Sequence, residues 1–281
     1  MALFLAVLLT VVSVAGVAQA EVGPPIPPGI DNPTFAAPAV APMPELTWTV
    51  GDPFPVVDGK TIFPSVAVPV SGGTSPPPAY ATHWYAGSVY SGSAHTATWM
   101  FTQIKTPKKL PKADEFYYVL LSAWDNAGSY NQIGFADAYG VWGLTYSWTS
   151  GPCTDPTYHY SANAMALSLS TVYKFYINTE SGGTWFEAFV GSTMVWWLWA
   201  ATGGTALTVD DFYCGSYDYT DYIEVWQTHD PGGYPKFTFK FKFNQWWDGV
   251  WHETSWIAFE VGPVPAITTV TITGQKVVIY K

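Results

Sequence analysis

Two polar side chains stand in apolar runs of the sequence and could together perform hydrolysis. Gln132 lies in YNQIGFADAYG, and Glu224 lies in YIEVWQTH. A carboxylate can take a proton from water, and a carboxamide N–H can stabilise the negative charge that develops on a carbonyl oxygen. If neighbouring strands bring the two side chains together, they form a pair that activates water. Gln132 and Glu224 are therefore the predicted catalytic residues.

Other acidic residues compete with Glu224 for the role of base. Asp125, Glu187 and Asp221 are the alternatives, and Asp221 lies three positions before Glu224. In a regular strand two residues three apart point to opposite faces, so only one of them can face Gln132. A strand glutamine is more often a hydrogen-bonded structural amide, and a strand glutamate usually faces solvent. The interpretation of this pair therefore depends on whether the two side chains meet.

Several other chemistries have no support in the sequence. No G-x-S-x-G motif accompanies the serines, and the acidic residues do not have the spacing of a calcium loop. The histidines occur singly, without the pairs typical of a zinc site. We therefore predict no metal and no cofactor. The histidines are His83, His95, His159, His229 and His252.

The elements that must position these residues are predicted to be strands. From about residue 81 onward, short runs alternate apolar and polar residues and are separated by Gly, Asn, Asp, Ser and Pro. FTFKFKF places its phenylalanines on one face and Lys240 and Lys242 on the other. Strands without interspersed helices indicate an all-β fold. We expect a two-sheet antiparallel β-sandwich, a concanavalin-like jelly roll, over residues 81–262, with C-terminal strands in 263–281.

The N-terminal part has a different composition. Residues 1–20 form an apolar run that ends in Ala-Gln-Ala, which is typical of a cleaved signal peptide; a retained membrane anchor is the alternative. Residues 21–80 are rich in proline, which favours an extended prosegment or spacer with at most one or two edge strands. Export predicts a secreted or cell-surface protein, no stable membrane insertion once the signal is removed, and a disulfide between Cys153 and Cys214.

Charge and aromatic content restrict the partners. The net charge is −10 and the chain contains no arginine, which argues against nucleic acid as a partner. Trp, Tyr and Phe make up 17% of the residues. Exposed aromatic rings stack on sugars, so a non-catalytic sandwich that binds a surface glycan is an alternative function. A structural subunit of an extracellular filament is a further alternative.

Several segments, in order, resemble the glutamic peptidases (eqolisins). HWYAGSVYSG and TATWMF are similar to two early strands of that family, and LLSAWDNAGSYNQIGFADAYG is similar to its segment with the catalytic Q-x-G. Gln132 and Gly134 fall on that motif. WGLTYSW and YIEVWQTH correspond to later strands, and the resemblance covers roughly residues 82–245. Substrate-binding residues are expected at Trp84, Trp148 and Trp226.

The resemblance implies peptide hydrolysis at acid pH without a metal. Glu224 would act as general base toward water and then as general acid toward the leaving amine. Gln132 would orient the water and donate to the oxyanion. Two positions depart from the family pattern: Ser147 replaces a glutamate, and Asp221 fits the family's glutamate in another register. If neither acid faces Gln132, the chain is a relative without the chemistry.

Overall fold

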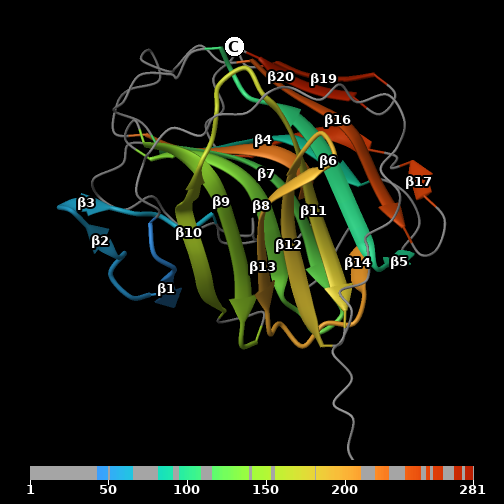
Figure 1. Ribbon diagram of the computed structural model, residues 1–281. Helices are drawn as coiled ribbons and strands as arrows, with labels where there is room; N and C mark the ends of the chain where they lie inside the picture. Colours follow the sequence, from blue (N-terminus) through green and yellow to red (C-terminus); the bar gives the residue numbers. More distant parts are fainter. Residues whose placement is uncertain are drawn as a thin grey trace, which may run out of the picture. The chain divides into compact units, whose positions relative to one another are not determined.

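In the computed structural model the described residues form strands, turns and irregular segments, and no helix occurs among them (Figure 1). No described helix is therefore long and apolar enough to cross a membrane. The structure describes residues 43–49, 51–65, 82–90, 95–108, 116–138, 141–152, 156–180, 182–209, 219–227, 238–247, 251–253, 256–261, 269–273 and 276–280. The signal-peptide prediction and the predicted Cys153–Cys214 disulfide lie outside these residues.

The first sheet is antiparallel throughout its described ladders and carries both members of the predicted pair. At the side of β7 (Phe116–Asp125), the short strand β14 (Leu207–Val209) pairs with β7, and β5 (His95–Ala97) pairs with β14. The order is β1 (Leu46–Thr49), β10 (Thr157–Ala166), β9 (Val141–Ser150), β8 (Tyr130–Ala138), β7 (Phe116–Asp125), β15 (Tyr219–Gln227), β4 (Thr82–Tyr90) and β18 (Trp256–Val261), with β14 (Leu207–Val209) and β5 (His95–Ala97) off this path.

The second sheet contains the C-terminal strands. β19 and β20 extend it beyond β16, so the strands predicted in residues 263–281 belong to the sandwich. The order is β13 (Thr193–Ala200), β12 (Gly183–Val190), β11 (Val172–Glu180), β6 (Trp99–Lys105), β16 (Thr238–Trp247), β20 (Lys276–Tyr280) and β19 (Thr269–Thr273), with β17 (Trp251–Glu253) paired to β16.

The main core lies between the two sheets. Val119 and Phe135 from the first sheet belong to the same buried cluster as Phe175 and Phe186 from the second. Figure 1 shows β7 and β8 beside β11, and β8 beside β12, consistent with this shared core. Alternate residues of each strand supply this layer, because successive side chains point to opposite faces. The predicted all-β sandwich is confirmed, whereas its jelly-roll connectivity stays a prediction.

A second buried cluster lies on the outer face of the first sheet, the face turned away from the second sheet. Tyr118, Tyr160 and Tyr222 project from the strands, and Ile62 and Phe63 pack on them from the N-terminal segment. All nine residues of β8 are therefore buried, which explains why this strand carries few charges. The proline-rich part of the chain is thus not only a spacer: between residues 43 and 65 it covers the sheet.

A tight turn explains the path of the chain between residues 46 and 61. β1 pairs in register with β10, as an edge strand of the first sheet. The chain then forms a two-stranded hairpin, β2 (Val56–Val57) and β3 (Lys60–Thr61). Asp58 and Gly59 connect its strands with φ values of 51° and 74°. An Asp-Gly pair with positive φ at both positions is the preferred two-residue hairpin turn, and it directs the chain back over the sheet.

Candidate active site

Gln132 and Glu224 both lie on the outer face of the first sheet. Gln132 is in β8, Glu224 is in β15, and β7 runs between these strands. Gln132 is opposite Ser122 of β7, and Glu224 is opposite Tyr118, so the two positions project from the same face. Both side chains are fully buried. The structure therefore brings together the two residues that sequence patterns selected.

The hydroxyl of Ser65 lies between the amide and the carboxylate. Gln132 Nε2 donates to Ser65 Oγ at 3.0 Å, and Ser65 Oγ donates to Glu224 Oε2 at 2.5 Å. Ser65 is 2% exposed. One oxygen atom is thus within hydrogen-bonding distance of both members of the pair, which is the arrangement that a bound water would need.

Hydrogen bonds on both sides fix the orientation of the Gln132 amide. Ser147 Oγ donates to Gln132 Oε1, while Gln132 Nε2 also donates to the hydroxyl of Tyr222. The amide carbonyl is therefore turned toward β9, and its N–H groups face β15 and Ser65. Ser147 contributes the hydroxyl that holds this orientation.

Tyr222 completes the cluster. Its hydroxyl lies 3.3 Å from Ser65 Oγ. Burial, and then the charge of Glu224, raise the pKa of Tyr222 well above its usual value, so the hydroxyl stays neutral. Sequence reasoning missed this residue, although its position two residues before Glu224 places it on the same strand face. Ser65 was also missed, and nothing in the TIFPS sequence marks it as a partner of distant strands.

Two of the three tryptophans predicted to bind substrate do not line this face, which corrects that prediction. Trp84 pairs with Val225, the neighbour of Glu224 on the opposite strand face, and is fully buried in the core between the sheets. Trp148 follows Ser147, so it also points to the other side, where it stacks on His159 with ring centroids 3.9 Å apart. The structure does not describe the side chain of Trp226.

Two of the acids that compete with Glu224, Asp125 and Glu187, lie away from Gln132 in the structure. Asp125 accepts hydrogen bonds from the backbone N–H groups of Ala127 and Ser129 at 3.0 and 2.9 Å, which stabilises the turn after β7. Glu187 lies on β12 of the second sheet, so it does not share a sheet face with Gln132 and Glu224. The side chain of Asp221 is not among those described.

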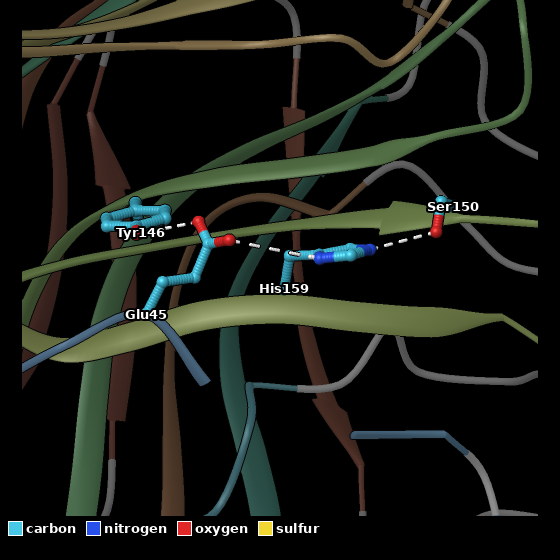
Figure 2. Close-up of polar contacts among 4 residues, drawn as sticks. All are labelled: Glu45, Tyr146, Ser150 and His159. Atoms are coloured by element: carbon cyan, nitrogen blue, oxygen red, sulfur yellow. Dashed lines mark hydrogen bonds and ion pairs between the residues drawn. The ribbon is translucent and has the colours of Figure 1, made fainter. Parts of the chain in front are cut away.

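A smaller polar cluster ties the start of the N-terminal segment to β9 and β10 (Figure 2). The hydroxyl of Tyr146 donates to Glu45 at 2.8 Å, and His159 Nδ1 lies 4.0 Å from the other Glu45 oxygen. Ser150 Oγ is 2.9 Å from His159 Nε2. Burial lowers the pKa of His159, and the Glu45 charge partly opposes this effect. The cluster anchors the residues that precede β1.

No group of metal-binding side chains occurs among the residues that the structure describes. The chain matches no protein-family model and no curated protein.

Proposed function

We propose that the chain is an acid endopeptidase in which Gln132 and Glu224 activate a water molecule for attack on a peptide bond. The observation that carries this proposal is the convergence of both side chains on a single oxygen atom, that of Ser65. The resemblance of the segments around both residues to the glutamic peptidases supports the same reaction. The apolar N-terminus supports a secreted location, where a polypeptide substrate is available.

The proposed reaction places a water oxygen where the Ser65 hydroxyl lies. Glu224 takes one proton from this water as its oxygen bonds to the peptide carbonyl carbon. Gln132 Nε2 donates to the oxygen that becomes negative. Glu224 then gives the proton to the leaving nitrogen as the C–N bond breaks, which yields a carboxylic acid and an amine. Ser147 and Tyr222 act as positioning residues, because each contacts the Gln132 amide.

Cleavage of a denatured protein between pH 2 and 7 tests this proposal. The assay compares the wild type with a Phe63→Ala/Ser65→Gly variant, called the loosened variant. These substitutions remove side-chain contacts that hold residues 63 and 65 over Gln132 and Glu224. Glu224→Gln in the loosened variant is expected to reduce cleavage by about 10²-fold or more. Glu187→Gln is the matched control and should retain activity, because Glu187 lies on the other sheet.

The result that would overturn the proposal is the absence of cleavage by both folded proteins across this pH range. Circular dichroism in the near ultraviolet checks that the proteins are folded. Cleavage that survives Glu224→Gln but is lost in Asp221→Asn would instead assign the base to Asp221.

A second candidate function, carbohydrate binding, is supported by an aromatic surface on the second sheet. Trp197 and Trp199 of β13 are 58% and 42% exposed. The ring of Trp185 lies 5.4 Å from that of Trp197. Such rings can stack on the C–H faces of sugars. Retention on insoluble polysaccharides that is lost in Trp197→Ala would support this function, and equal retention of the variant would contradict it.

A further inference from the structure

The segment over the catalytic pair is held by its backbone in the manner of a bound peptide. Tyr160 of β10 donates to the carbonyl oxygen of Ile62 at 2.6 Å, and Tyr118 of β7 donates to the carbonyl oxygen of Phe63. Ser65 then contacts Glu224 of β15. The segment therefore crosses the sheet from β10 toward β15, and side chains of the sheet bind its consecutive carbonyl groups.

Side chains of the segment add an aromatic contact next to the pair. Phe63 is fully buried, and its ring meets the ring of Phe116 edge-on at 5.6 Å. The ring centroid of Phe54 lies 5.0 Å from that of Phe63. Ile62 is 2% exposed, and its backbone N–H donates to the carbonyl of Pro55 at 2.9 Å. Residues 54–65, called the covering segment, thus include the β2–β3 hairpin, and contacts at its two ends hold Ile62 and Phe63 in place.

We propose that the covering segment occupies the peptide-binding surface of the Gln132–Glu224 site as a resident inhibitor. This inference rests on the proposed peptidase function and adds its substrate recognition and regulation. Tyr118 and Tyr160 are assigned as residues that bind the main chain of a substrate. Phe116 is assigned as the contact for an aromatic substrate residue two positions before the point that Ser65 occupies.

The same geometry explains why the covering segment would inhibit the site without being cleaved. The Ser65 hydroxyl takes both hydrogen bonds that the attacking water would require, so no water is held between Gln132 and Glu224. The segment is also part of the same chain, which gives it an effective concentration on the order of millimolar. A substrate at micromolar concentration would bind only after the covering segment is displaced.

Phe63→Ala and Ile62→Ala test the inhibition, because each weakens the covering segment and leaves the pair intact. Each variant is expected to raise kcat/KM on an unfolded protein substrate by about tenfold or more, since the open form becomes more populated. Phe189→Ala is the control: it removes a phenylalanine ring from the second sheet and should leave kcat/KM unchanged. Equal activity of the wild type, Phe63→Ala and Ile62→Ala would overturn the proposal.

A binding measurement separates failure of this inference from failure of the peptidase function. A fluorescently labelled synthetic peptide with the sequence of residues 54–65 is titrated against the loosened variant, and its anisotropy is recorded. Binding that Tyr118→Phe and Tyr160→Phe weaken supports the peptide-binding surface, even if no cleavage is detected. Cleavage without such binding would support the peptidase and overturn the resident inhibitor.

Substrate preference gives a third readout. Cleavage products of a peptide mixture are sequenced after digestion by the loosened variant. The expected result is an excess of Phe, Tyr or Trp at one fixed position before the cleaved bond. A random distribution of aromatic residues around the cleaved bonds would contradict the role assigned to Phe116.

Discussion

The outer faces of the two sheets both bury polar side chains, but these side chains differ in their hydrogen-bond partners. On the first sheet Gln132 and Glu224 share hydrogen bonds with Ser65, from a segment distant in sequence. On the second sheet Lys174 and Gln103 lie opposite each other on β11 and β6 and are 1% and 7% exposed. Among the described residues, Lys174 Nζ and Gln103 Oε1 have no hydrogen-bond partner.

The difference shows which face holds its polar side chains in a connected cluster. A buried polar group without a partner destabilises the fold, whereas a connected cluster can hold a precise geometry. On the first sheet each hydrogen bond orients the amide or the carboxylate. On the second sheet Tyr176 packs with Trp99, Phe101 and Phe189, and Lys174 lies opposite Phe189; the described residues provide no hydrogen-bond partner for the Lys174 ammonium or the Tyr176 hydroxyl. The predictions below test this contrast.

Replacing a buried glutamine on each face should give the largest difference. In the loosened variant Gln132→Ala is expected to reduce peptide cleavage by about 10²- to 10³-fold, because the donor to the oxyanion is lost. Gln103→Ala should change the rate by less than about twofold, since its amide lies on the other sheet. Initial rates at the optimal pH measure both effects. Equal losses in the two variants would mean that the decrease reflects general destabilisation.

Aromatic residues on the two faces should differ in their contribution to stability. Phe63→Ala is expected to lower the free energy of unfolding by about 3 kcal/mol, because a fully buried ring is removed. Trp197→Ala should change it by about 0.5 kcal/mol or less, since that ring is 58% exposed. Urea unfolding followed by circular dichroism measures both values. A small change in Phe63→Ala would show that the covering segment contributes little to the stability of the sandwich.

Sequence patterns predicted the strands, and with them the strand face on which Gln132 and Glu224 lie, because both depend on local periodicity. The alternation in YIEVWQ places Glu224 on one face of its strand, and Gly134, two residues after Gln132, marks a close approach between strands. At Gly134 a Cβ atom would lie 2.0 Å from the carbonyl oxygen of Val119, so this position excludes a side chain.

The role of residues 62–65 could not be predicted in the same way. Their hydrogen-bond partners in the first sheet are 55 to 159 residues away in the chain, and proline-rich composition gives no information about what the segment covers. The tryptophans were misassigned for a related reason. The strand positions of Trp84 and Trp148 direct both side chains to the core side of the sheet, away from Gln132 and Glu224. A family resemblance does not by itself define the face on which a side chain lies.

Removing the buried ammonium group from the second sheet should stabilise the protein. Burial lowers the pKa of Lys174 to about 8. Lys174→Met is therefore expected to raise the free energy of unfolding by about 1 to 3 kcal/mol at pH 7. The gain should shrink as pH rises from about 8 to 10.5, because the folded wild type loses its proton first. Lys105→Met, at an exposed position, is the control. Urea unfolding of all three proteins at pH 7, 9 and 10.5 checks the effect, and a loss of stability in Lys174→Met would indicate that the ammonium group has a stabilising partner.

Glu187 should give the smallest effect and the one most dependent on pH. Burial raises the pKa of Glu187 to about 7, so its ionised form is disfavoured in the folded protein. The folded state keeps its proton while the unfolded state releases it, and stability is lost as pH rises from about 4.5 to 7. Glu187→Gln removes this loss. The variant should match the wild type at pH 4 and exceed it by about 1 kcal/mol at pH 8, because Glu187 is only partly buried. Thermal unfolding at both pH values measures the difference. A gain of equal size at pH 4 and pH 8 would attribute it to packing and not to the carboxylate charge.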